Sequence, residues 1–204
     1  MPTIHRLPDQ APLRTRLIRG LCRSALALLV ATLGLGGYVG YLQLSGNVHS
    51  VVAGEIYRSA QPSTAQLTAY ASRYGLRTVV NLRGANPGRP WYDQEVAASA
   101  HLGVAHVDFR MSASRELTQA EAERLLAILN AADKPLLIHC QSGADRSGLA
   151  AALYLAAIAR HGEAAAEDQL SIRYGHIGLP HVSSAYAMDR TWETLEPWLG
   201  LAGS

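Results

Sequence analysis

Residues Leu136 to Gly148 read L-L-I-H-C-Q-S-G-A-D-R-S-G, and this stretch decides the fold of the chain. The apolar run Leu136–Ile138 predicts a buried strand, and the almost wholly apolar stretch Ser147–Arg160 predicts a buried helix. The tight loop between them begins with Cys140 and ends with Arg146. Such a loop directs backbone N–H groups and the positive end of the following helix toward one point, so the stretch predicts an anion site.

The side chains of this segment, Cys140–Arg146, which we call the cysteine loop, suit phosphate chemistry. Helix N-termini and nearby cations stabilise thiolates, so a nucleophilic thiolate is expected at Cys140. Arg146 offers a planar fork of donors that can hold two phosphate oxygens. Gly143 permits the positive φ that a loop bent around an anion needs. Ser147 is expected to donate to the cysteine sulfur, and His139 to fix the loop by hydrogen bonding.

The run His139-Cys140-Gln141-Ser142-Gly143-Ala144-Asp145-Arg146-Ser147 resembles the H-C-x5-R-S/T signature of the cysteine-dependent protein tyrosine and dual-specificity phosphatases. The resemblance implies attack by Cys140 on phosphorus, a phosphocysteine intermediate and its hydrolysis by water, with no metal or other cofactor. It also implies that the loop binds the phosphate through Gln141, Ser142, Gly143, Ala144, Asp145 and Arg146. The alternative is a buried structural cysteine with an arginine at this spacing by chance. The complete signature favours the functional interpretation.

Two further segments extend the resemblance over most of the domain. Tyr57-Arg58-Ser59-Ala60-Gln61-Pro62 resembles a segment near the start of bacterial and fungal dual-specificity-like phosphatases, and Val79-Val80-Asn81-Leu82-Arg83 accompanies it. Arg58 and Arg83 lie near predicted strand ends, where they are candidate substrate contacts. Surface charge at strand ends is the alternative, and the sequence leaves both interpretations open.

The general acid is the assignment that departs from the common pattern. A phosphatase of this class needs a carboxylic acid to protonate the leaving oxygen. Most relatives place an Asp on a separate loop, here between Asp108 and Glu116, but no Asp stands in the middle of that segment. Some phosphoinositide phosphatases and bacterial tyrosine/lipid phosphatases carry Asp directly before the loop arginine, as Asp145 does. We therefore predict Asp145 ahead of Asp108, with Glu116 third; for Asp145 the alternative is a carboxylate that only pairs with a neighbouring arginine.

The N-terminal region predicts a membrane anchor. No charged residue occurs from Ser24 to Leu44, which as a helix is about 30 Å, enough to cross a bilayer. Five arginines precede this stretch, and no Lys or Arg follows it until Arg58. The positive-inside rule then predicts a single-pass inner-membrane protein with a cytoplasmic basic tail (1–23), an anchor (24–44) and a periplasmic phosphatase domain (45–204). A cleaved signal peptide is disfavoured, because the nearest A-x-A-like site, Val51-Val52-Ala53, lies well past the apolar stretch.

Charge and cysteine content agree with this organisation. Beyond the anchor the chain has 13 basic and 15 acidic residues, which excludes a basic nucleic-acid-binding footprint. Cys140 is the only thiol of the domain, because Cys22 precedes it on the cytoplasmic side, so Cys140 has no intramolecular disulfide partner. No metal site is predicted, because six histidines lack a ligand spacing: His49, His101, His106, His161, His176 and His181.

The domain alternates strand and helix patterns. This order predicts an α/β fold with a central, largely parallel sheet flanked by helices and a site at the carboxyl end of a strand. The expected strands are Gly54–Arg58, Arg77–Leu82, Val104–Phe109 and Lys134–His139. Expected helices are one capped by Ser63 with Gln66, Tyr92–His101, one opened by Thr118 with Glu121 and ending near Asn130, Ser147–Arg160, Glu163–Tyr174 and Ser183–Leu195.

Three functions remain open from the sequence. The first is a membrane-anchored phosphatase of the dual-specificity type that acts on phosphotyrosine or phosphoserine/threonine in proteins. The second is a phosphatase of lipid or lipopolysaccharide headgroups, which the outward-facing domain and the position of Asp145 favour. The third is an inactive phosphate-binding module, which the complete set of loop residues disfavours.

Overall fold

The computed structural model describes residues 13–201 of the chain, which divides into two compact units, Met1–Tyr41 and Leu42–Ser204. Helix α1 (Leu13–Leu44) makes up the described part of the first unit, and its stretch Leu17–Leu44 is long and apolar enough to cross a membrane. The predicted apolar N-terminal helix is therefore confirmed. A signal sequence has the same character, so its use as an anchor stays a prediction. Residues 1–12 of the predicted basic tail lie outside the described residues.

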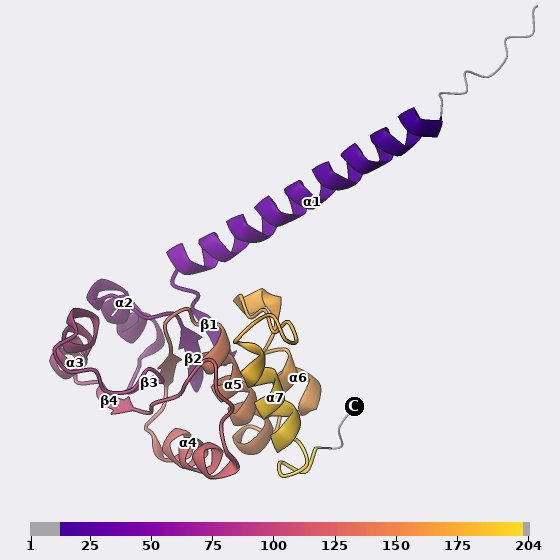
Figure 1. Cartoon of the computed structure of the whole chain (residues 1–204). Helices are drawn as coiled ribbons and strands as arrows, with labels where there is room; N and C mark the ends of the chain where they lie inside the picture. The colour runs from indigo at the N-terminus through magenta and orange to yellow at the C-terminus, as the bar shows by residue number, and fades with distance from the viewer. Residues whose placement is uncertain (1–12, 202–204) are drawn as a thin grey trace, which may run out of the picture. The chain divides into compact units, whose positions relative to one another are not determined.

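The second unit is an α/β domain built on a five-stranded sheet (Figure 1). The strand order is β1-β2-β5-β3-β4; β1 pairs antiparallel with β2, and the other neighbours are parallel. The predicted central, largely parallel sheet is thus confirmed. The strands are β1 (His49–Val52), β2 (Ile56–Ser59), β3 (Thr78–Asn81), β4 (Ala105–Asp108) and β5 (Leu136–His139). The sequence did not predict β1, a short strand at the edge of the sheet.

Alternation along the strands assigns each side chain to one of two helical layers. Tyr57, Val79 and Leu137 pack with α2 (Thr64–Tyr74) and α3 (Pro90–Leu102). The intervening residues Ile56, Val80 and Ile138 pack in the other core, with α4 (Gln119–Ala131), α5 (Asp145–Leu153) and α7 (Tyr186–Leu195). Figure 1 shows α2 and α3 on one side of the sheet and α5 to α7 on the other.

Two helices begin where the sequence predicts, and the starts of two others differ by two or three residues. Both predicted capping boxes, Ser63 with Gln66 and Thr118 with Glu121, are confirmed. Helix α5 begins at Asp145, two residues early, and passes into a π-helical turn, η1 (Tyr154–Ile158). Helix α7 begins at Tyr186, three residues after the predicted Ser183.

The single helix predicted over Glu163–Tyr174 is wrong. The chain forms a short helix α6 (Glu163–Glu167) and then a 3₁₀ turn η2 (Ile172–Tyr174). Between them the backbone carbonyl of Gln169 accepts a hydrogen bond from buried Arg58, at 2.8 Å. Arg58 thereby holds the segment between α6 and η2 in a non-helical conformation beside β2.

The parallel strands finish together at one edge of the sheet. In the ladder, the last residues of four strands are partners in register: Ser59, His139, Asn81 and Asp108. The carboxyl ends of parallel strands meet at the same edge, where α/β proteins place their sites. The cysteine loop leaves this edge from β5, the central strand of the five-stranded sheet.

Candidate active site

The cysteine loop connects β5 to the first turn of α5. Gly143 has φ +73°, and a Cβ atom there would lie 2.5 Å from the backbone nitrogen of Ala60, just past β2. Only glycine fits so close an approach in this backbone conformation. The positive φ predicted for Gly143 is confirmed, and the loop lies close against the end of a neighbouring strand.

The backbone carbonyls of Gln141 to Ala144 accept hydrogen bonds from groups outside the loop. Gln61 N–H donates to the carbonyl of Gln141 at 3.2 Å. The side chains of Asn47 and Gln43 donate to the carbonyl of Ser142, at 3.0 and 3.1 Å. Because C=O and N–H of a trans peptide point in opposite directions, each bound carbonyl turns the next N–H group away from its partner.

Arg58 binds the remaining two of these carbonyls, from the interior of the domain. Its Nη2 donates to the carbonyls of Gly143 and Ala144 at 3.0 and 2.7 Å, and its Nη1 to the carbonyl and side-chain oxygens of Gln169 at 2.8 and 3.1 Å. The guanidinium also lies 4.2 Å from the ring centroid of Tyr174. The N–H groups of residues 142–145 are thus directed away from the bound carbonyls, which is the arrangement of an anion-binding nest.

The expectation that Arg58 contacts substrate needs correction. Its side chain is fully buried, at 0% exposure, and its guanidinium is engaged by protein carbonyls. Burial lowers the pKa of Arg58 to about 10, so it remains a cation at neutral pH. Arg58 therefore supports the loop electrostatically from inside the domain, on the α5 side of the sheet.

Cys140 and Arg146 lie at the two ends of the loop. The sulfur of Cys140 is 3.5 Å from Oγ of Ser147, and both residues are buried. Arg146 Nη1 donates to the carbonyl of Met111 at 3.4 Å, a long contact, while its Nε is buried without a hydrogen-bond partner. A buried N–H donor without a partner is costly, and a bound anion would satisfy it.

Glu95, His106 and His139 form a buried network on the other face of the sheet, which we call the Glu95 cluster. Oε1 of Glu95 accepts hydrogen bonds from Nε2 of His139 at 3.0 Å and of His106 at 2.8 Å. Its Oε2 accepts from the side chain of Gln61. Burial alone would raise the pKa of Glu95, but the two histidine bonds outweigh it and lower the pKa to about 2. The base of the cysteine loop is thereby tied to α3.

The three acid candidates have different surroundings. Asp108 accepts from Asn81 at 2.8 Å and from the hydroxyl of Tyr92 at 2.6 Å, a bond that raises the pKa of Tyr92 to about 12. Glu116 pairs with Arg190 at the surface. Asp145 lies in the cysteine loop itself, with Oδ1 held by His176 at 2.8 Å. Of the three, only Asp145 is carried by the loop that holds the thiol.

Arg83 lies at the rim of the site. Its Nη1 donates to Gln61 at 2.8 Å, and its guanidinium carbon lies 3.4 Å from the ring centroid of Trp91. Burial and then the positive charge of Arg146 lower the pKa of Arg83, so the guanidinium is within electrostatic reach of the loop. This position leaves Arg83 as a candidate substrate contact.

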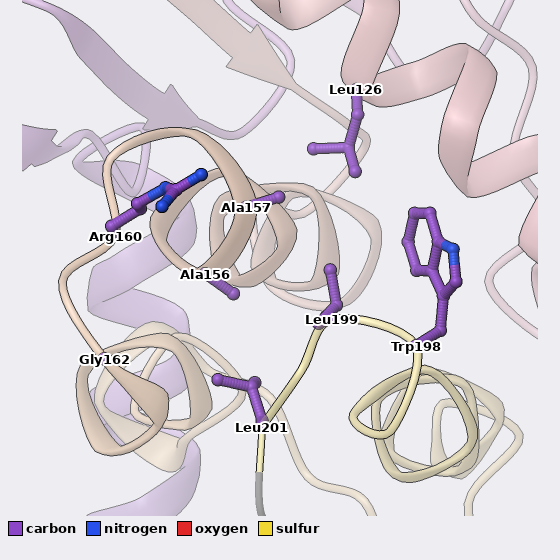
Figure 2. A pocket seen from close by; sticks show the side chains of 8 residues that line it. All are labelled: Leu126, Ala156, Ala157, Arg160, Gly162, Trp198, Leu199 and Leu201. Atoms are coloured by element: carbon purple, nitrogen blue, oxygen red, sulfur yellow. The ribbon is translucent and has the colours of Figure 1, made fainter.

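A separate apolar cavity lies away from the cysteine loop. It has a volume of about 580 Å³ and lies at the C-terminal end of the α5–η1 helix, whereas the loop is at the N-terminal end (Figure 2). Its lining includes Leu126, Trp198 and Leu199 and holds no nucleophilic side chain. Within residues 13–201, no group of three or more His, Cys, Asp or Glu side chains is arranged to hold a metal ion.

Several functional residues escaped the sequence analysis. Glu95 and Asn47 are buried polar residues, at 2% and 1% exposure, that hold the loop from α3 and from the segment after α1. His106 and His176 belong with them. Strand alternation is a sequence signal for His106 alone: it pairs with Val79 in the ladder and so shares the face of His139.

A parallel strand, a buried thiol, an amide-lined loop and an arginine six residues after the thiol define a cysteine-dependent phosphatase. The sequence agrees, because residues 35–176 match the model of the tyrosine phosphatase family. The chain belongs to this family. The phosphatase resemblance drawn from the cysteine loop is therefore confirmed.

Solved structures are similar over most of their length. TpbA from P. aeruginosa is 27% identical, with a TM-score of 0.56 over 76% of this chain and 92% of that chain. The core catalytic domain of the PP-IP phosphatase Siw14 from S. cerevisiae, in complex with citrate, is 21% identical, with a TM-score of 0.54 over 76% of this chain and 93% of that chain. PTPMT1 is 12% identical, with a TM-score of 0.53 over 75% and 98%. The chain has no significant match among curated proteins.

Proposed function

We propose that the chain hydrolyses phosphate monoesters with Cys140 as nucleophile and a phosphocysteine as intermediate. The observation that carries this proposal is the cysteine loop, whose carbonyls from Gln141 to Ala144 accept hydrogen bonds from groups outside the loop and whose Arg146 keeps a buried N–H without a partner. Preorganised N–H donors of this kind stabilise the negative charge of a transferring phosphoryl group. The same cradle binds the phosphate through residues 141–146.

The reaction needs two steps. Cys140 Sγ attacks phosphorus, the S–P bond forms as the ester P–O bond breaks, and Asp145 gives its proton to the leaving oxygen. Arg146 holds two of the phosphoryl oxygens throughout. Water then attacks phosphorus and yields its proton to Asp145, while the S–P bond breaks. Ser147 Oγ, 3.5 Å from the sulfur, stabilises the departing thiolate.

Phosphorylated proteins are the leading substrate class in this proposal, with both phosphotyrosine and phosphoserine/threonine accepted. A variant of TpbA, 23% identical to this chain, is known in complex with pTyr. Arg83 and the ring of Trp91, 3.4 Å apart, supply a cationic and aromatic rim that suits a peptide substrate. Arg83 is thus the proposed contact outside the loop.

Phosphorylated lipid or glycolipid headgroups are the second candidate class, favoured by a specific observation. Gln43 and Asn47, at the end of α1 and just after it, both donate to the carbonyl of Ser142 in the cysteine loop. Asn47 is three positions after Leu44 in the chain, a reach of about 10 Å. If Leu17–Leu44 anchors the chain in a bilayer, the loop is bound by residues only a few positions from the membrane, which favours a substrate of the membrane surface.

We propose a single-pass topology with a basic cytoplasmic tail (1–23), an anchor (24–44) and a phosphatase domain (45–204) on the periplasmic side of the inner membrane. The arginine-rich segment before the anchor supports it. A reporter enzyme that works only outside the cytoplasm, fused after Ser204, should be active. A stable but inactive fusion would reverse the orientation.

Cys140→Ser tests the proposed reaction. Turnover of p-nitrophenyl phosphate should fall at least about 10⁴-fold, because the nucleophile is lost, while phosphate binding persists. Cys22→Ser is the matched control: it removes the other free cysteine, which is exposed on α1, and should retain full activity. Retained hydrolysis in Cys140→Ser would exclude the mechanism.

A wild-type chain that binds phosphate without turnover would be an inactive binding module. Rates on phosphopeptides, phosphoinositides and phosphorylated glycolipids would decide the substrate class.

A further inference from the structure

His176 lies between two carboxylates beside the cysteine loop. Its side chain is 1% exposed, and its ring nitrogens are both engaged: Nδ1 with Oδ1 of Asp145 at 2.8 Å and Nε2 with Oδ2 of Asp189 at 3.0 Å. Asp145 comes from the first turn of α5 and Asp189 from the first turn of α7. We call these three residues the His176 cluster.

The geometry limits where protons can lie in this cluster. A neutral imidazole has only one N–H, so it can donate to only one of the two carboxylates. Two hydrogen bonds therefore require two protons among the three groups. These are either an imidazolium between two carboxylates, or a neutral imidazole with one protonated carboxyl. When Asp145 is the protonated carboxyl, the two forms differ only in the position of one proton along the 2.8 Å hydrogen bond between His176 and Asp145.

The charges around the cluster favour retention of this second proton. Asp145 from α5 and Asp189 from α7 are the charged groups that face the ring, and Arg58 from β2 lies beneath the start of α5. Burial alone would lower the pKa of His176, but the hydrogen bonds and negative charges of Asp145 and Asp189 outweigh it, and the pKa is raised. The cluster thus keeps its proton at a pH where an isolated carboxyl, which titrates near pH 4, has lost it.

We propose that His176 is a positioning residue that stores the proton which Asp145 delivers to the leaving group. The proposal rests on the proposed role of Asp145 as general acid. As the ester P–O bond breaks, Asp145 protonates the leaving oxygen and takes up the Nδ1 proton of His176, which becomes neutral and stays held by Asp189 through Nε2. When water attacks the phosphocysteine, its proton returns through Asp145 to Nδ1, and the S–P bond breaks to release the thiolate.

One residue of the His176 cluster lies outside the segment that matches the tyrosine phosphatase family. Asp189 lies on α7, beyond residues 35–176 that match the tyrosine phosphatase model. The segment that carries His176 is packed close to α7, since a Cβ atom at Gly178 would clash with the carboxylate of Asp189. Helix α7 therefore contributes the negative charge of Asp189 to the His176 cluster and holds the imidazole ring through its Nε2.

The test is the pH dependence of kcat for the full-length chain on two substrates. Phenyl phosphate has a poor leaving group that needs the acid, and p-nitrophenyl phosphate has a better one that needs it less. His176→Asn keeps a polar side chain but cannot store a proton. Its basic limb on phenyl phosphate should move about 2 pH units lower, toward the range of an isolated carboxyl. At pH 7 its kcat on phenyl phosphate should fall at least about 10-fold, with a smaller loss on p-nitrophenyl phosphate.

Two further variants keep the proposal falsifiable. Asp189→Asn should move the basic limb in the same direction by about 1 pH unit, because one stabilising charge is lost. His181→Asn is the matched control: His181 is exposed and has φ +62°, a conformation that asparagine tolerates, so its profile should be unchanged. Equal losses on both substrates with an unmoved basic limb would assign His176 a purely structural role. If His176→Asn does not fold, an unmoved limb in Asp189→Asn overturns the proposal.

Failure of the proposed function would look different. A wild-type chain without turnover of either substrate would remove the phosphatase reaction itself. An unchanged profile in Asp145→Asn would remove the general acid. The proposal on His176 fails alone when Asp145→Asn loses its basic limb and the histidine variant keeps it.

Discussion

Two histidine–carboxylate networks flank the cysteine loop, and they are built in opposite ways. In the Glu95 cluster one buried carboxylate lies between two histidines and also binds Gln61. In the His176 cluster one buried histidine lies between two carboxylates that are 23% and 24% exposed. In the Glu95 cluster both carboxylate oxygens are bound by protein donors, so the cluster holds the position of the cysteine loop. The His176 cluster has fewer protons than oxygen acceptors and leaves Asp145 partly exposed at the start of α5, which suits proton transfer.

The largest expected effect follows from breaking the Glu95 cluster. Glu95→Ala should lower the free energy of unfolding by about 3–5 kcal/mol, because His139, His106 and Gln61 lose a buried partner at once. Urea denaturation measures the loss. Glu95→Gln keeps the size and one acceptor oxygen, and should lose less. A Glu95→Ala chain as stable as the wild type would show that α3 does not hold the loop.

The next effect separates the first two of the three acid candidates, Asp145 and Asp108. Asp145→Asn should lower kcat on phenyl phosphate by about 10²- to 10⁴-fold and flatten the basic limb, because the leaving oxygen is no longer protonated. Asp108→Asn should keep kcat within about 3-fold and cost stability instead, about 1 kcal/mol, since Asp108 is bound by Asn81 and Tyr92. The reverse result would assign Asp108 as the acid.

The alternation of the strands explains how much of this site follows from the sequence. Residues 136–148 indicated the buried strand, the loop, the helix and the roles of their side chains, because all these signals are local. The same alternation, applied to β2, separates Arg58 from Tyr57 and turns the arginine toward α5, beneath the loop. A substrate contact was predicted for Arg58 because it lies near a strand end. Its side chain is instead buried, because it lies on the face of β2 that packs toward α5.

The remaining residues of the site could not be predicted, because their partners are distant in the chain. Glu95 reaches His139 from 44 residues earlier, and Asp189 reaches His176 from a helix whose packing against α5 no local pattern encodes. The break in the helix predicted over Glu163–Tyr174 has the same origin. Buried Arg58 on β2 donates a hydrogen bond to the carbonyl of Gln169 in that segment, and a local helix pattern does not encode this contact.

The two clusters should also respond to pH in opposite directions. The pKa of Glu95 is lowered to about 2 from an unfolded value of 4.5, so its contribution to stability is complete above pH 4.5 and is lost as the pH falls toward 2. The pKa of His176 is raised above 6.5, so its contribution is complete below pH 6.5 and is lost as the pH rises through the folded value. The midpoint of urea denaturation, measured across pH, should fall both on the acid side, below about pH 4.5, and on the alkaline side, above about pH 6.5. Glu95→Gln should flatten the acid side, and His176→Asn the alkaline side.

The smallest effect sharpens the distinction between holding and proton transfer. His106→Asn removes one donor from the Glu95 cluster but leaves His139 and Gln61 on the carboxylate. It should cost about 1.5 kcal/mol of stability, the lower end for one hydrogen bond to a charged group, because the carboxylate keeps its other partners. Because His106 is separated from the loop by Glu95, kcat and its pH profile should stay within about 3-fold of the wild type. A moved basic limb in His106→Asn would show that protons also pass through the Glu95 cluster, and the two networks would then share one function.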